Sequence, residues 1–174
     1  MREEISSLLS CLDLEDFREK NAAVSDLAML LEKNTYILSG GHADSRLNEY
    51  GQFLPEELLT VTLSIEEQEE IVADLTQRIR SGGPLSSSML WAIGKASPEV
   101  GLSALTEILK CDVVALDDKM SYQFLIALDN FVISFTEAGP LSLEKEFIRF
   151  LENHSRSRNE RLAESDERVL RKIK

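Results

Sequence analysis

Apolar residues recur with the period of an α-helix through nearly the whole chain, and this pattern is the feature that most constrains the fold. Helical spacing is seen at Phe17, Val24, Leu27 and Leu31, which are expected on the apolar face of one helix, and Asp13 or Asp16 stands where it can cap its start. No segment alternates apolar and polar residues as a half-buried strand does. The chain is therefore predicted to be all-α, with proline and glycine marking the helix ends.

Residues 55–80 predict two consecutive helices. Pro55 suits the first turn of a helix that continues through Leu63. Ser64 and Glu67 then form a capping-box pattern, in which the Ser64 hydroxyl accepts from the Glu67 amide and the Glu67 carboxylate reaches back. The second helix is expected over residues 65–80, with its apolar residues on one face, and the following Ser-Gly-Gly-Pro sequence ends it.

A buried helix followed by a half-exposed helix is a pattern that recurs along the chain. Residues 87–96 are apolar nearly all the way round, as in a helix covered on several sides, and Ser97 with Pro98 starts a helix with a single apolar stripe. The segment LIALDNF repeats the buried helix 35 residues after LWAIGKA, and Ser142 starts its partner. Units of about 35 to 42 residues, repeated about three times, predict an α-solenoid.

The stretch WAIGKASPEVGLSALTEILKCD resembles one unit of the HEAT-like helical repeats. It has a small residue and Ile-Gly at the end of the first helix, a proline at the turn, spaced leucines in the second helix and an acid at its close. The stretch SYQFLIALDNF is similar to the first helix of the next unit, with Asp129 in place of the glycine of the pattern. The resemblance implies a right-handed α-solenoid-like stack of antiparallel helix pairs, with about 7–9 helices in all and the pairs best seen in residues 55–154.

Charge divides the chain into two parts. Residues 155–174 carry seven basic and four acidic side chains, whereas the other residues carry 12 basic and 27 acidic ones. We expect residues 1–154 to form a single α-helical domain, followed by a basic C-terminal tail or terminal helix over residues 155–174. Three alternatives stay open for this tail: an amphipathic helix packed on the acidic body, disorder, or a basic arm. Residues 35–54 are expected to be a loop that can include a short helix around residues 45–50.

Few residues in the chain are suited to catalysis or metal binding. His42 lies in the loop sequence Ser-Gly-Gly-His and His154 lies near a predicted helix end, and neither has a second metal-type ligand at a recognised spacing. Neither glycine pair leads into the Gly-Lys-Ser/Thr ending of a phosphate loop. Cys11 and Cys111 are interpreted as reduced, structural thiols. We therefore expect no enzyme activity, no cofactor and no metal site, with a catalytic site around His42 as the enzyme alternative.

The net charge of −12 points to a basic partner. An acidic body repels phosphate groups, so it is not expected to bind nucleic acid, and it attracts basic macromolecules. The acids expected on outward helix faces and turns are predicted to contact this partner: Glu66, Glu69, Glu70, Glu99, Glu107, Asp112, Asp117 and Asp118. The alternative is that this acidity only keeps the protein soluble.

A non-catalytic protein-binding domain is the function that these patterns favour. The leading hypothesis is an immunity-type inhibitor that neutralises a basic protein such as a nuclease toxin, because the small size, the acidity and the lack of reactive groups are similar in a general sense to those of bacterial immunity proteins. The alternative is a HEAT-like scaffold or adaptor subunit of a larger assembly.

The sequence also predicts where the protein resides. No apolar run approaches the ~18 residues that a membrane-spanning helix needs. The N-terminal stretch MREEISSLLSCLDLEDF has acids where a secretory signal has basic residues. We expect a cytoplasmic protein that does not associate with membranes.

Overall fold

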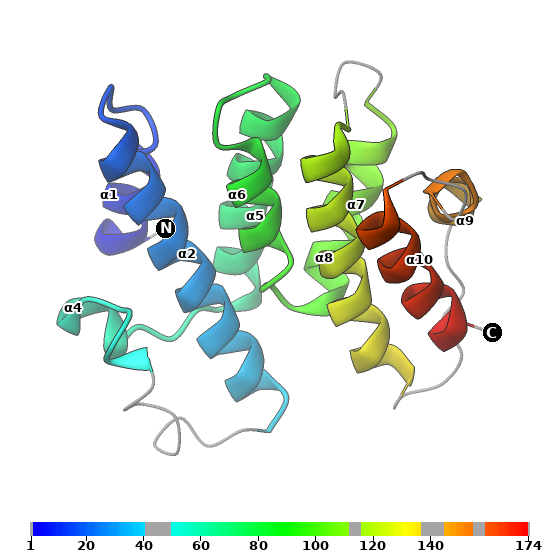
Figure 1. Ribbon diagram of the computed structural model, residues 1–174. Helices are drawn as coiled ribbons and strands as arrows, with labels where there is room; N and C mark the ends of the chain where they lie inside the picture. The colour runs from blue at the N-terminus through cyan, green and yellow to red at the C-terminus, as the bar shows by residue number, and fades with distance from the viewer. Residues whose placement is uncertain (1, 41–49, 112–115, 137–144, 155–158, 174) are drawn as a thin grey trace.

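The computed structural model describes residues 2–40, 50–111, 116–136, 145–154 and 159–173, and within these ranges it contains nine helices and no strand. In chain order the helices are α1 (Glu3–Cys11), α2 (Phe17–Leu38), α4 (Glu56–Leu59), α5 (Ile65–Arg80), α6 (Ser86–Ile93), α7 (Pro98–Leu109), α8 (Asp118–Thr136), α9 (Lys145–His154) and α10 (Glu160–Ile173). Figure 1 shows the longer helices side by side, from α1 and α2 near the N-terminus to α9 and α10 near the C-terminus. The predicted all-α class and helix number are confirmed.

The longer helices form two rows. In one row α2 packs against α6, α6 against α8, and α8 against α10. In the other row α1 packs against α5, α5 against α7, and α7 against α9. Contacts between α1 and α2, α5 and α6, α7 and α8, and α9 and α10 join the rows. Helices α5 and α7 are therefore neighbours in one row, and the candidate site lies between them.

The closest helix pairs differ from those expected from the sequence. The repeat pattern grouped residues 87–96 with the helix that follows Ser97, but α6 packs mainly against α2, α5 and α8, and α7 packs against α5 and α8. A reason is visible at Gly101 of α7, where the absent side chain leaves room for the ring of Phe131 of α8. The main contacts of α6 and of α7 are therefore with other helices and not with each other.

Helix α6 is the buried helix that its sequence predicts. It contacts α2, α5 and α8, and four of its side chains belong to the core: Met89, Leu90, Ala92 and Ile93. Trp91 is partly buried against that core, and the Lys95 amine lies 5.7 Å from the centre of its ring. The apolar residues of this short helix are thus accounted for by its contacts with three other helices.

Two of the predicted helix starts form as expected, whereas the Ser97 side chain makes no capping hydrogen bond to α7 and the start predicted at Ser142 lies outside the described residues. The Glu67 amide donates to the Ser64 hydroxyl at 3.2 Å, and the Ser64 amide donates to the Glu67 carboxylate at 3.0 Å, which completes the capping box of α5. Of the two candidate caps for α2, Asp16 takes the position and accepts from the Arg18 amide at 2.6 Å. Asp13 pairs with Arg78 of α5 instead.

The expected helix over residues 55–63 is wrong in its length, because α4 ends at Leu59. The buried Lys33 amine of α2 donates to three backbone carbonyls in this region, those of Leu58, Leu59 and Val61. The Asn34 side chain accepts from the Leu63 amide at 2.7 Å. Hydrogen bonds to the side chains of Lys33 and Asn34 replace helical hydrogen bonds in this segment. Residues 60–63 therefore run along α2 without forming a helix.

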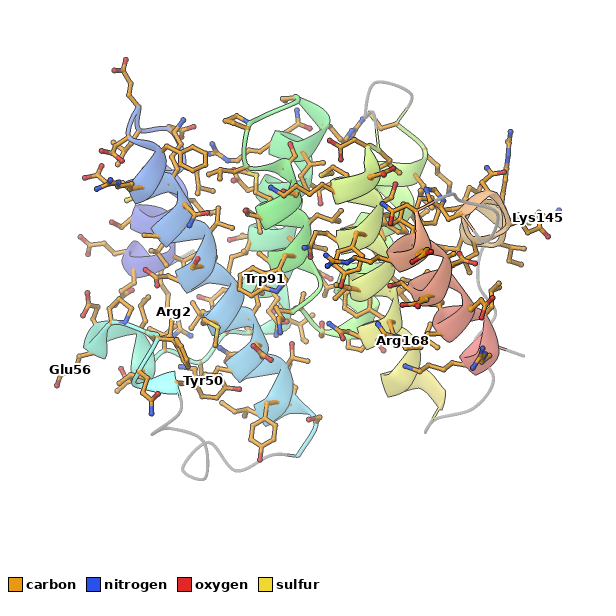
Figure 2. All side chains as sticks on the ribbon, viewed as in Figure 1. Arg2, Tyr50, Glu56, Trp91, Lys145 and Arg168 are labelled. Atoms are coloured by element: carbon orange, nitrogen blue, oxygen red, sulfur yellow. The ribbon has the colours of Figure 1, made fainter. Side chains whose placement is uncertain are left out.

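The basic C-terminal segment contains α10, which packs against α8. Arg168, labelled in Figure 2, places its Nε 3.0 Å from Asp129, and the Lys172 amine lies 2.6 Å from the same carboxylate. The Asp129 side chain is only 8% exposed. Asp129, the acid that departs from the repeat pattern, therefore forms ion pairs with two cations of α10. The side chains of Leu162 and Val169 of α10 are buried in the core.

Two further expectations concern the loop and membranes. Helix α2 extends through Leu38, so the loop begins later than expected, and most of the short helix expected around 45–50 lies outside the described residues. Within the described ranges, no helix has both the length and the apolarity needed to cross a membrane.

Candidate functional site

A groove of about 280 Å³ lies between α5 and α7. Buried apolar side chains line it, namely Val72 of α5 with Val100 and Ala104 of α7. Three of the predicted acids also line it: Glu69, Glu99 and Glu107. The groove therefore combines an apolar lining with carboxylates from both of its helices.

The positions of these acids follow from the sequence of the two helices. The apolar face of α5, with Ile71, Leu75 and Ile79, packs in the core. Glu69 lies off this face and lines the groove at the solvent-exposed surface. Glu99 and Glu107 are eight residues apart on α7, about two helical turns, and so lie on one face. All three acids are exposed at the residue level.

One cation lies near this groove. The Arg80 guanidinium is 3.9 Å from the Glu107 carboxylate, and both side chains are about half exposed. A solvent-exposed pair at that separation is worth at most about 1 kcal/mol. Glu107 is therefore available to another cation at little cost.

The other predicted acids have different surroundings. Glu66 is exposed near the start of α5, where the hydrogen bond from its own backbone amide and then the one from Ser64 lower its carboxyl pKa. Glu70 is exposed and does not line the groove. Asp117 accepts from the Met120 amide at 2.8 Å, and Asp118 accepts from the Asn159 side chain at 2.9 Å. These two acids thus cap α8 and link it to the residue preceding α10.

The eighth predicted acid, Asp112, lies outside the described residues. The same holds for His42, on which the enzyme alternative depended. The structure thus brings together three of the eight predicted acids in one groove.

The sequence reasoning did not identify Thr76 and Ile65 as residues of the groove. Thr76 is buried and lines the groove, and its hydroxyl has no hydrogen-bond partner among the described residues. Ile65 also lines the groove and is 39% exposed, so the groove has an apolar side chain in contact with solvent. The signal for Ile65 was its place directly after Ser64, since the first residue of a capped helix faces outward before the apolar stripe begins.

A polar cluster at the other end of the molecule was also missed. The His154 Nε2 atom lies 3.1 Å from the Ser121 hydroxyl, and its Nδ1 atom lies 2.9 Å from the Phe150 carbonyl. Ser121 is only 1% exposed. The described residues contain no group of three or more histidine, cysteine or acidic side chains arranged to hold a metal ion. The cluster is thus a set of buried polar contacts between α8 and α9.

Asp166 of α10 adds a buried carboxyl to this region. Both of its oxygens are buried, and neither has a hydrogen-bond partner within the described part of the chain. Burial raises the pKa of Asp166 to about 6, the charge of His154 opposes this rise, and that of Glu167 adds to it. The folded protein therefore holds a proton on Asp166 at pH values where the unfolded chain, with a carboxyl pKa near 3.8, has released it.

Replacing Asp166 by asparagine is expected to stabilise the protein at pH 7.5 by about 1–2 kcal/mol. The parent loses stability as pH rises from about 4 through about 6, because the folded state binds the proton more tightly than the unfolded state does. The advantage of Asp166→Asn should therefore vanish near pH 4. Urea unfolding at both pH values measures it, with Glu164→Gln on the exposed side of α10 as the control. A variant less stable than the parent at pH 7.5 contradicts this account.

Comparison with known protein families, curated proteins and solved structures finds no match for this chain. The candidate site is therefore interpreted from its own geometry and charge.

Proposed function

We propose that this chain is a non-catalytic protein-binding domain whose α5–α7 groove takes a basic segment of another protein. The observation that carries the proposal is the combination of Glu69, Glu99 and Glu107 with an apolar groove lining. A partner segment with Lys or Arg beside a small apolar side chain complements both features. Such complementarity sets specificity and speeds association more than it adds to affinity.

The architecture supports a binding role. Within each row, each helix contacts the next helix of the same row. Contacts limited to adjacent units are typical of repeat proteins. We interpret the stack as a right-handed, HEAT-like α-solenoid of antiparallel pairs. Such stacks offer extended surfaces on which other macromolecules dock.

An immunity-type inhibitor is the specific form of this function that we favour. The net charge of −12 steers a basic protein toward the domain from a distance. Occupation of a basic cleft on a nuclease toxin by this acidic face would block access of the phosphate backbone to that cleft. The domain itself needs no reactive group for such inhibition.

A scaffold or adaptor subunit is the alternative, and one observation favours it. Ile65 leaves a large apolar side chain exposed at the groove, and exposed apolar surface marks stable interfaces as well as transient ones. An assembly interface built on Ile65 would resist salt, whereas one built on the three acids would weaken as salt screens them. The two functions therefore differ in salt dependence.

The test compares two triple variants of the tagged protein. The groove variant carries Glu69→Gln, Glu99→Gln and Glu107→Gln. The control variant carries the same change at three exposed acids that do not line the groove: Glu4, Glu15 and Glu164. Both variants lose three negative charges, so a difference between them reports the groove and not the net charge.

We expect the parent and the control variant to retain a basic protein from native lysate at ~50 mM salt and to release most of it at ~200 mM salt. The groove variant should bind that protein at least about tenfold more weakly, as expected for the loss of several complementary charges. A nuclease assay on the purified partner, with and without one equivalent of the domain, then tests inhibition. Equal binding by the two variants would contradict the groove as the partner-binding site. Retention of the partner at both salt concentrations would favour the adaptor function.

A further inference from the structure

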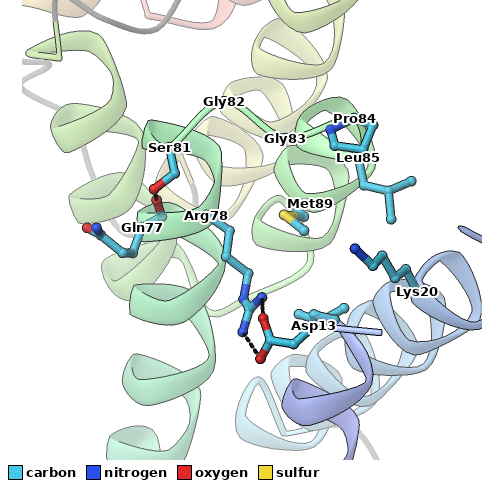
Figure 3. A pocket seen from close by; sticks show the side chains of 11 residues that line it. Asp13, Lys20, Gln77, Arg78, Ser81, Gly82, Gly83, Pro84, Leu85 and Met89 are labelled. Atoms are coloured by element: carbon cyan, nitrogen blue, oxygen red, sulfur yellow. Dashed lines mark hydrogen bonds and ion pairs between the residues drawn. The ribbon is translucent and has the colours of Figure 1, made fainter. Parts of the chain in front are cut away.

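A second cavity, of about 400 Å³, opens between the α1–α2 turn, the end of α5 and the start of α6. Buried apolar side chains form much of its lining: Leu12, Leu85 and Met89. The charged side chains that line it are Asp13, Lys20 and Arg78, as Figure 3 shows. An apolar cavity of this size with few polar groups is the usual form of a small-molecule site. It shares no lining residue with the α5–α7 groove.

Two of the three charged side chains are already committed to each other. The Arg78 Nη1 and Nη2 atoms bond to the two oxygens of Asp13 at 2.6 and 3.2 Å. The Arg78 Nε atom bonds to Asp74 at 2.6 Å. The hydrogen bond from Arg78 lowers the pKa of Asp13, and the charge of Arg78 and then that of Lys20 add to this effect, so Asp13 stays ionised. This bidentate pair fixes the wall of the cavity and commits most of the Arg78 donors to acceptors of the protein itself.

Lys20 differs from this pair. It is half-buried on α2 and forms no direct ion pair within the described part of the chain. In Figure 3 its amine extends across the cavity toward Met89 and Leu85. Among the charged groups that line the cavity, Lys20 is therefore the one whose donors are available beside the apolar lining.

We propose that this cavity binds a small organic carboxylate with an apolar body. The apolar body packs against Leu85 and Met89, and the carboxylate accepts from the Lys20 amine. An amine of the same shape meets the positive charge of Lys20, and an alcohol accepts a weaker hydrogen bond from Lys20 than a carboxylate does. The cavity should therefore rank the three head groups, with the carboxylate first.

Octanoate serves as the probe, and the methyl groups of the methionines report where it binds. Titration of protein labelled with ¹³C at the methionine methyls should shift the Met89 resonance, because Met89 lines the cavity. The resonances of Met29 and Met120, which do not line it, should stay in place. We expect a Kd of roughly 0.1–1 mM, as for a ligand of few atoms in an open cavity. Octanol and octylamine should bind about fivefold or more weakly.

The Lys20→Gln variant tests the role of the charge. It should bind octanoate about tenfold more weakly, while its affinity for octanol stays unchanged, because only the charge-assisted contact is removed. Lys119→Gln, an exposed position outside the cavity, changes the net charge equally and should bind like the parent. The proposal is overturned if octanoate leaves the Met89 resonance unmoved, or if Lys20→Gln keeps the parent's preference for octanoate over octanol. The outcome is independent of the α5–α7 groove, since no variant touches that groove.

Discussion

The Lys33→Met variant is expected to lose about 3 kcal/mol of unfolding free energy at pH 7. Lys33 is 2% exposed and donates to the carbonyls of Leu58 and Leu59, both at 2.9 Å, and to that of Val61. Methionine has nearly the same shape but no donor, so carbonyls buried at this site lose their partner. Each buried carbonyl left without a donor costs about 1–3 kcal/mol of stability. Removal of the ammonium also removes the desolvation penalty of a buried charge, which offsets part of that loss.

The pH dependence of this difference identifies the buried charge. Burial lowers the pKa of Lys33 to about 8, against 10.5 as the ordinary value. Between these pH values the unfolded chain binds a proton that the folded protein has released, so the stability of the parent gains from rising pH. The gap between parent and Lys33→Met should therefore widen, by about 2 kcal/mol between pH 7 and pH 10.

Urea unfolding of both proteins at the two pH values measures this gap, since other groups titrate alike in both. Lys95→Met is the matched control, because Lys95 is half-buried and pairs with Glu32 at 3.1 Å. That variant should lose less than about 1 kcal/mol. A constant gap between pH 7 and pH 10 would mean that Lys33 is not the group that titrates.

Lys33 also shows why the sequence predicted α4 too long. Residues 55–63 have the composition of a helix, and local propensity favours its continuation. A lysine 25 residues earlier takes the carbonyl of Leu58 instead. No local pattern announces such a contact, because lysine is ordinarily exposed and its burial is decided by tertiary packing.

The capping box and the buried helix α6 were predictable for the opposite reason. Ser64 and Glu67 bond to each other across three residues, so their chemistry is contained in the local sequence. The apolar circumference of α6 likewise requires burial whatever the neighbours are. Which helix covers which face was not predictable, because Gly101 decides it through a contact with Phe131, 30 positions later.

The candidate site was predicted in part. Helical periodicity identified Glu69, Glu99 and Glu107 as outward-facing, and the stacking of α5 on α7 brought them together. Asp117 and Asp118 are equally outward in the sequence pattern, yet they bond to Met120 and Asn159. A pair of acids before an apolar helix is as typical of a cap as of a binding surface, and sequence alone does not separate the two.

The Gly101→Val variant is expected to lose about 3 kcal/mol of unfolding free energy. A Cβ atom at Gly101 would lie 2.0 Å from the Phe131 Cζ atom and 2.6 Å from its Cε2 atom. The Phe131 side chain is buried, with only 1% of its surface exposed. Overpacking of a core contact costs about 1–3 kcal/mol, and the ring has no solvent to move into. The better helix propensity of valine over glycine returns only a few tenths of a kcal/mol.

A double-mutant cycle with Phe131→Leu tests whether this contact is the cause. The smaller side chain opens space beside α7, so the loss from Gly101→Val should shrink by 1 kcal/mol or more in the Phe131→Leu background. Ser103→Val, two residues on and exposed, controls for the effect of valine in this helix. If the loss is the same in both backgrounds, then the ring of Phe131 does not set the approach of α7 to α8.

The same cycle links the fold to the proposed function. Gly101 lies on α7 between Glu99 and Glu107, so a shift of α7 away from Phe131 moves both acids relative to Glu69 on α5. Gly101→Val should therefore weaken capture of the basic partner under conditions where the variant is fully folded, and Phe131→Leu should restore part of that capture. Ser103 lines the groove, so the control for binding is Thr106→Val, which lies on the same helix outside the groove lining and should bind as the parent does. If a folded Gly101→Val variant binds the partner as the parent does, then the packing of Gly101 against Phe131 does not determine the shape of the groove.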